Sequence, residues 1–216
     1  MKNKQWLAAA AALGGVATAA GGQQAPAVGG ADCELHVWPA GDLKAVTQGW
    51  VFNHTLNQAF DLAKGGTAKP AVLAPERQVT LLQAMDLPMA LKLPPQTRVV
   101  MHSEPLPRSR EGAKERQSPS SSPCYSELVV SQIFYDDAPM ARGGLKTLAL
   151  YRVFADAPLL RTSFATWTET ELSTFPAKSA AEARAADEEL ILAYRSNLRG
   201  FAGHALAPPK KKGRKN

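Results

Sequence analysis

The sequence has few of the residues that usually reveal a protein's chemistry. It contains only two cysteines and four histidines among 216 residues, and aromatic residues make up 7% of the chain. No histidine has the spacing of a metal ligand to another histidine, a cysteine or a carboxylate. The chain also lacks the G-x-S-x-G nucleophile motif and a glycine-rich phosphate loop. We therefore predict no catalytic, metal-binding or cofactor-binding residue from its motifs, and no cofactor.

A long hydrophobic run is also missing. The most apolar stretch, residues 6–20, is mostly alanine and is interrupted by two glycines, whereas a membrane-spanning helix needs roughly 20 predominantly apolar residues. A short basic start precedes this stretch, and the small residues Ala17-Thr18-Ala19 lie near its end. That order is typical of a bacterial secretory signal peptide. We predict that residues 1–19 are removed and that the mature protein is periplasmic or secreted, with no transmembrane segment.

Positive charge is concentrated at the two ends of the chain. Of the formal net charge of +6, the predicted signal peptide holds two units and the last seven residues hold five, so that residues 20–209 carry a net charge of −1. We expect residues 207–216 to be a disordered basic tail, either simply solvated or in contact with an anionic surface. In an exported protein we expect lipid headgroups, lipopolysaccharide or cell-wall polymer as partners rather than nucleic acid. The basic residues of the tail are Lys210, Lys211, Lys212, Arg214 and Lys215.

The predicted export of the protein affects the oxidation state expected for its two cysteines, Cys33 and Cys124. An oxidising environment and an even cysteine count favour a disulfide between them, and the alternatives are two buried free thiols or one reactive thiol. Closing so long a loop would stabilise the fold by roughly 4–5 kcal/mol in the chain-entropy model. The residues before Cys33 do not match a bacterial lipobox, so we expect no lipid anchor there.

The pattern of apolar residues predicts alternating strands and helices. Residues 33–38 alternate strictly, with Glu34, His36 and Trp38 on the face opposite Cys33. Ser179-Ala180-Ala181-Glu182 matches a capping box before an apolar stripe with helical spacing. We predict strands at 33–38, 97–102, 124–135, 145–154 and 160–168, and helices at 43–63, 75–88 and from 179 onward.

Together these elements predict an α+β fold in a single domain. We expect a mixed, largely antiparallel sheet of four to five strands over residues 32–206, covered by two or three helices. The strands at 124–135, 145–154 and 160–168 are too close in sequence for crossover helices, so they form an antiparallel meander. Residues 20–31 are a flexible linker, and residues 103–123, rich in serine, proline and charge, are a mobile loop.

These features favour a non-enzymatic binding or interaction module of the cell envelope. Its partner would be a protein or an anionic envelope component. The alternative is a small secreted hydrolase with a dispersed site around His36, His102 or Glu127, which a pocket gathering a histidine with a carboxylate would favour. Cross-strand pairing of Glu127 with Lys146 or Arg152 would explain these charges without any such site. Neither the ligand nor the oligomeric state follows from the sequence.

Overall fold

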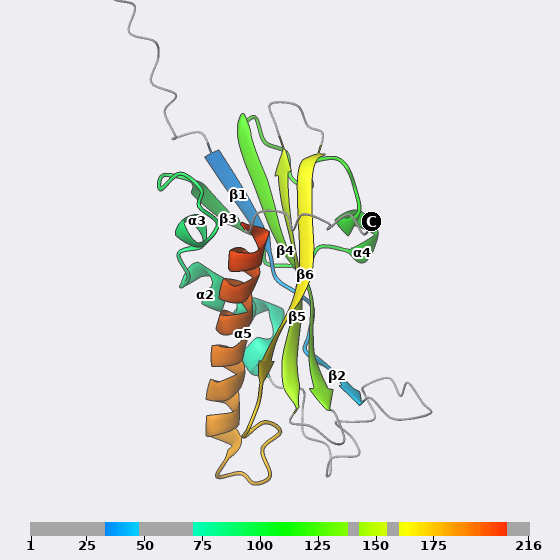
Figure 1. Cartoon of the computed structure of the whole chain (residues 1–216), viewed down its shortest axis with the longest axis vertical. Helices are drawn as coiled ribbons and strands as arrows, with labels where there is room; N and C mark the ends of the chain where they lie inside the picture. Colours follow the sequence, from blue (N-terminus) through cyan, green and yellow to red (C-terminus); the bar gives the residue numbers. More distant parts are fainter. Residues whose placement is uncertain (1–32, 48–70, 138–142, 155–159, 207–216) are drawn as a thin grey trace, which may run out of the picture.

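The computed structural model describes residues 33–47, 71–137, 143–154 and 160–206. It confirms the predicted α+β class, with one mixed sheet and helices packed on it (Figure 1). Among the described residues, no helix is both long and apolar enough to cross a membrane.

The sheet is six-stranded, with five strands on one continuous path in the order β3-β1-β4-β5-β6. The short strand β2 pairs with β4 off this path. β1 is parallel to both β3 and β4, whereas β4, β5 and β6 form the predicted antiparallel meander. The strands are β1 (Cys33–Trp38), β2 (Lys44–Thr47), β3 (Arg98–Met101), β4 (Cys124–Asp137), β5 (Gly144–Phe154) and β6 (Leu160–Glu171).

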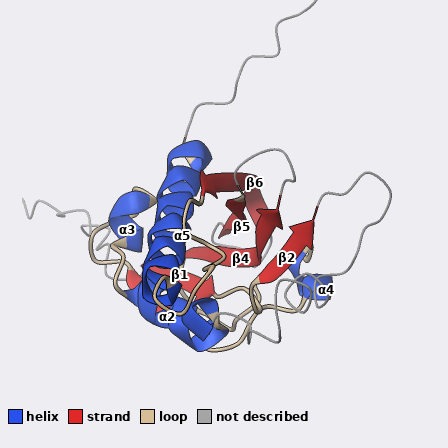
Figure 2. Ribbon diagram, turned by 90° about the horizontal axis from the view of Figure 1, so that it is seen from below, coloured by secondary structure: helices blue, strands red, loops and turns tan. Residues whose placement is uncertain are grey.

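The helices lie on both sides of the sheet, but unequally. Figure 2 shows α2, α3 and α5 on one side and the short α4 on the other. The helices are α2 (Pro75–Gln83), α3 (Leu87–Ala90), α4 (Arg108–Glu111) and α5 (Ala183–Ala205), with a 3-10 helix at Ala71–Leu73.

The main hydrophobic core fills the space between the sheet and α2, α3 and α5. Leu35 and Val37 of β1 face it together with Leu128 and Val130 of β4. Because side chains alternate along a strand, the intervening residues of β1 and β4 point to the opposite face. The apolar stripe of α5 covers the core from the other side, and Phe201 on this stripe is 1% exposed.

Two buried amides fix the helices to the rest of the fold. The Gln78 side chain of α2 accepts a hydrogen bond from the Ala40 N–H at 2.9 Å and donates to the Leu73 carbonyl at 2.8 Å. Asn197 of α5 donates to the Leu145 carbonyl of β5 at 2.7 Å. Since buried polar groups must find partners, these amides determine where each helix sits along the sheet.

Three expected elements differ from the structure. The helix predicted over 75–88 ends at Gln83, and the separate short helix α3 begins at Leu87. The helix predicted over 43–63 is wrong at its start, where residues 44–47 form β2, and the rest of that helix lies outside the described residues. Parallel pairing with β4 supplies the backbone hydrogen bonds of these residues, so tertiary contacts override the local helical pattern. The last helix begins at Ala183 rather than 179, because the residues before it form turns in which the N–H groups of Glu182 and Ala183 donate to the carbonyls of Ser179 and Ala180.

Candidate functional site

The face of the sheet that points away from the main hydrophobic core carries most of the side chains suited to binding or catalysis. His36 of β1, Glu127 of β4 and Arg152 of β5 occupy one row across neighbouring strands. Glu127 is 0% exposed and Arg152 is 1% exposed, which is rare for charged residues. The cover over this face is the segment 103–123, which contains α4 (Figure 1).

Glu127 and Arg152 form a buried ion pair between β4 and β5. The predicted cross-strand pairing is confirmed for these two residues. The Tyr125 hydroxyl donates a hydrogen bond of 2.7 Å to Glu127 Oε1. Burial, and after it the hydrogen bond to Glu127, raises the pKa of Tyr125 far above its ordinary value, so the phenol stays a proton donor.

The segment 103–123 is attached to this ion pair by its backbone. The Gln117 N–H donates to Glu127 Oε1 at 2.7 Å, and Arg152 Nη1 donates to the carbonyls of Glu111 and Ala113, each at 3.0 Å. The Arg116 guanidinium lies over the Tyr125 ring, 4.8 Å from its centroid. Both members of the charged pair are therefore hydrogen-bonded to the backbone of this segment.

Two histidines and a carboxylate meet beside this network. His36 Nδ1 and His102 Nε2 are 3.0 Å apart, and His36 Nε2 lies 3.1 Å from Glu34 Oε2. The ring centroids of the two histidines are 5.3 Å apart, so the rings meet end to end, as in a hydrogen bond. Since one ring nitrogen must donate and the other accept, a single proton is shared between them. Trp38 stacks on His102 with a centroid distance of 4.0 Å.

The ionisation of Glu34 and His102 follows from their surroundings. Burial alone raises the pKa of Glu34, but hydrogen bonds from Ser120, Arg98 and His36 outweigh it and hold the pKa at about 2. Burial, and then the charge of His36, lowers the pKa of His102 to about 4. Near neutral pH the cluster therefore pairs an ionised carboxylate with a neutral His102.

The carboxylates of this cluster already accept hydrogen bonds from neighbouring groups, which limits the reactions they can take part in. Glu34 accepts from the Ser120 hydroxyl at 2.6 Å as well as from His36, and Glu127 accepts from Gln117 and Tyr125. His36 is 3% exposed, whereas His102 is only half-buried. Over the described part of the chain, no three His, Cys, Asp or Glu side chains gather in a way that would hold a metal ion. The chain Glu34–His36–His102 can move a proton, and the Ser120 hydroxyl beside it donates to Glu34 rather than to either histidine.

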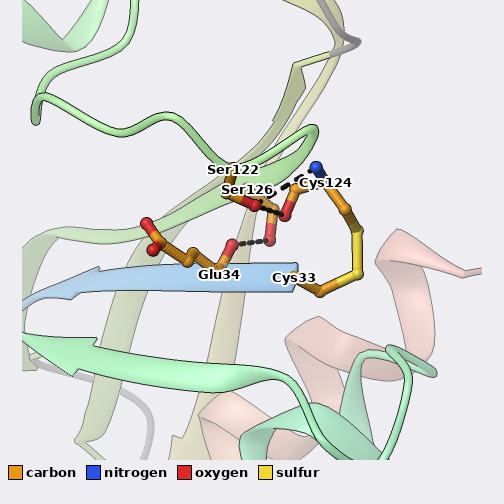
Figure 3. Close-up of a disulfide and its surroundings, with 5 residues drawn as sticks. All are labelled: Cys33, Glu34, Ser122, Cys124 and Ser126. Carbon is orange, nitrogen blue, oxygen red and sulfur yellow. Dashed lines mark hydrogen bonds between the residues drawn. A yellow bond between two sulfur atoms is a disulfide. The ribbon is translucent and has the colours of Figure 1, made fainter. Parts of the chain in front are cut away.

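The disulfide between Cys33 and Cys124 is present, as predicted. It joins the first residue of β1 to the first residue of β4, which the parallel register places opposite each other (Figure 3). On the β4 side, the Ser122 hydroxyl donates to the Cys124 carbonyl at 3.0 Å, and the Ser126 hydroxyl donates to the Glu34 carbonyl at 3.3 Å. Because Cys33 is bonded to Cys124, its sulfur carries no lipid.

The other residues singled out by the sequence lie elsewhere. Lys146 pairs with Asp136 and, at 3.7 Å, with Glu169, away from the histidines. His204 is exposed on α5, and His54 lies outside the described residues. The basic residues of the tail, 210–215, also lie outside them.

Sequence reasoning missed the contributions of Tyr125, Arg116 and Ser120. Tyr125 could have been found, because its parity in β4 places it on the same face as Glu127. Arg116 and Ser120 could not, since they lie in a segment without periodicity whose position depends on buried groups far away in the sequence.

The fold and these contacts define a class: a disulfide-linked α+β domain with a helix-covered core on one sheet face and a polar network under a covering segment on the other. No protein-family model matches the chain, and no curated protein matches it. Among solved structures, the chain is similar to the crystal structure of a Xanthomonas campestris protein described as family DUF330. That likeness has a TM-score of 0.37 and 11% sequence identity, and it covers 80% of this chain and 87% of the other.

Proposed function

We propose that this chain is an exported, non-enzymatic binding module of the cell envelope, periplasmic or secreted after removal of residues 1–19. The Cys33–Cys124 disulfide supports the compartment, because disulfides form and persist in oxidising environments. The basic start, the alanine-rich stretch and the small residues before position 20 point the same way.

The contacts of the buried charged residues support the proposal that the protein is not an enzyme. Glu127 and Arg152 direct their hydrogen bonds to the backbone of the segment 103–123, and Glu34 is held by three neighbouring side chains. Catalytic acids and bases need access to a substrate proton. Groups that hold a segment in place are instead expected in a domain whose function depends on its outer surface.

The partner that the sequence favours is an anionic component of the envelope, contacted by the basic tail. Five positive charges within residues 210–215 supply a sequence-independent attraction worth about 1 kcal/mol for each residue near an anionic membrane surface. Lipid headgroups, lipopolysaccharide and cell-wall polymer share this chemistry. A tail that follows a nearly neutral domain would leave the remaining surface available for a protein partner.

Vesicle sedimentation tests the tail. The mature chain should bind phosphatidylcholine vesicles that contain phosphatidylglycerol but not vesicles of phosphatidylcholine alone, and added salt should weaken the binding. Deleting residues 210–216 should abolish it. Binding that survives the deletion would refute the role of the tail, and preferential, steeply salt-dependent binding to duplex DNA would favour the nucleic-acid alternative.

Export is tested separately by fractionation. The protein should be recovered outside the cytoplasm with Ala20 as its first residue and with both cysteines resistant to alkylation until a reductant is added. Recovery only from the cytoplasm, with Met1 retained, would contradict the proposal whatever the tail binds.

The convergence of His36 and His102 with Glu34 keeps a small hydrolase as the second candidate. Hydrolysis of nitrophenyl esters by the purified protein, lost in His102→Gln but kept in His204→Gln, would establish it. An equal background rate in all three proteins would remove this candidate.

A further inference from the structure

Strand β6 ends the sheet, and among the described residues no strand pairs with its outer edge. It is 12 residues long and contains no proline. Its charged residues lie only near its two ends: Arg161 at the start, and Glu169 and Glu171 at the finish. An unpaired edge of this length is a template for another strand, because its outward N–H and C=O groups have no partner in the sheet.

The ladder between β5 and β6 shows which residues offer these groups. The Leu172 N–H, directly after β6, donates to the Gly143 carbonyl at 2.8 Å. Because antiparallel partners alternate between bonded and non-bonded pairs, the even-numbered residues of β6 from 162 to 170 direct their backbone groups toward β5. The Leu160 N–H, before the register shift, donates instead to the Lys114 carbonyl at 2.7 Å. The odd-numbered residues from 163 to 171 therefore present theirs to the outside.

We propose that β6 pairs antiparallel with β6 of a second copy of this chain, about a two-fold axis at Thr166. This register places Ala165 opposite Trp167 of the second copy, and Ser163 opposite Glu169 of the second copy. Each pair consists of two odd-numbered residues, so their outward N–H and C=O groups can bond to each other. The two sheets would then become one continuous sheet through an isologous interface.

The charges of the edge strand are complementary to those of its own reversed copy. At each end of the interface, Arg161 of one copy meets Glu169 and Glu171 of the other. The register of the ladder with β5 shifts between Val153 and Phe154, opposite the start of β6, so Arg161 lies beyond the regular part of the ladder. There the long Arg161 side chain, rather than backbone pairing, completes the interface. Opposite charges on facing strands stabilise the pairing, and like charges would oppose it.

The exposed aromatic residue of β6 lies next to the axis. Trp167 is 44% exposed, although its ring packs edge-on against Phe134 with a centroid distance of 5.1 Å. In the proposed register it covers the small side chain of Ala165 in the second copy, and the two Trp167 residues are diagonal neighbours on one face. Diagonal aromatic side chains across an antiparallel pair are within reach of each other.

Mass measurement of the chain by sedimentation is the first test. A dimer of twice the monomer mass of 23.1 kDa is expected at micromolar concentrations. A monomer at all concentrations up to the millimolar range would overturn the proposal.

Charge reversal tests which surface forms the dimer. Arg161→Glu gathers three carboxylates at each end of the interface, and Glu169→Arg/Glu171→Arg gathers three cations there. Each variant alone should dimerise about tenfold more weakly or worse, whereas an equimolar mixture should form a heterodimer because every end is again complementary. The recovery on mixing also shows that both variants fold.

Glu76→Arg, exposed on α2, is the matched control and should dimerise as the wild type does. Variants that dimerise unchanged would place the interface elsewhere and overturn the proposal.

A single added cysteine tests the register. Both natural cysteines are bonded to each other, so Thr166→Cys introduces one free thiol per chain. At the axis it faces its own copy in a non-bonded pair, with Cα atoms about 4.5 Å apart, within the range that a disulfide requires. Mild oxidation should cross-link Thr166→Cys but not Thr162→Cys, which faces Thr170 of the second copy. Equal cross-linking of the two variants would contradict the register.

Discussion

Glu127 and Arg152 are oppositely charged residues on adjacent strands that the fold has removed from water. Desolvation of both groups costs several kcal/mol, which their mutual attraction offsets only when the remaining hydrogen bonds are also made. Tyr125 and the backbone of the segment 103–123 supply such bonds to Glu127 Oε1 and Arg152 Nη1, whereas the buried Arg152 Nε makes none among the described residues. The pair is therefore a means of positioning more than a source of net stability.

Removal of one charge from this pair should be far more damaging than removal of an exposed one. Glu127→Gln keeps an oxygen acceptor for Gln117 and Tyr125 but leaves Arg152 buried without a counter-charge, and it should lower the free energy of unfolding by about 3 kcal/mol. Glu188→Gln is the control, because Glu188 is exposed beside Arg184 on α5, and it should cost less than about 1 kcal/mol. Urea denaturation measures both, and equal losses would contradict the structural role of the pair.

His102 should make the stability depend on pH. Its pKa is about 4 in the fold, against 6.5 when unfolded, so acidification protonates the unfolded chain first. The stabilisation is complete above pH 6.5 and declines as the pH falls toward 4, by about 1–2 kcal/mol after allowance for partial exposure. His102→Gln should flatten the urea-derived stability in this window, and His204→Gln on the exposed part of α5 should not. A wild-type curve that is already flat between these values would refute the expectation.

At the scale of elements, the segment 103–123 owes its place to one apolar contact and several polar ones. Leu106 is buried against Trp38 and Val129 in a small second hydrophobic cluster. Neither this contact nor α4 follows from the composition of the segment, which predicts only a loop. The anchoring partners come from β1, β4 and β5, which are neighbours in the sheet although β1 is distant from the other two in sequence.

Truncation of Leu106 should loosen this segment selectively. Leu106→Ala is expected to lower the free energy of unfolding by about 2–3 kcal/mol, and trypsin should then cleave more rapidly after Arg108 or Arg110. Met89→Ala is a suitable control because Met89 is 72% exposed and should change neither measurement. Unchanged cleavage of the Leu106 variant would show that the polar contacts alone hold the segment.

At the scale of the whole molecule, the disulfide closes a loop between residues 91 positions apart in sequence. The loop holds β2, β3, α2, α3 and α4, so the bond restricts about half of the described chain in the unfolded state. Replacing Cys33 and Cys124 together by alanine should lower the free energy of unfolding by about 4 kcal/mol. Dithiothreitol should destabilise the wild type by a similar amount and leave the variant unaffected. A loss below about 1 kcal/mol would mean that the unfolded chain is already compact.

The site was only partly predictable. Strict alternation in residues 33–38 placed Glu34 and His36 on one face, and parity in β4 and β5 placed Glu127 and Arg152 across from each other. The meeting of His36 with His102 depends on β3 pairing in parallel with β1, and this crossover carries no local sequence signal. Contacts made through backbone groups, such as the Gln117 N–H, leave no trace in residue identity.

The spacing of apolar residues in the sequence was enough to predict the antiparallel meander, the long final helix and a sheet with two faces of different polarity. It also predicted a disulfide between Cys33 and Cys124, because two cysteines in an oxidising compartment allow only one intramolecular pair, and the parallel register of β1 with β4 decided that the two residues meet. The tertiary structure alone decided that residues 44–47 are a strand and that the segment 103–123 covers a buried charged row. The physical reason is common to both: backbone hydrogen bonds and buried charges are satisfied by whatever the fold brings near, so their partners are set by topology rather than by neighbours in the chain.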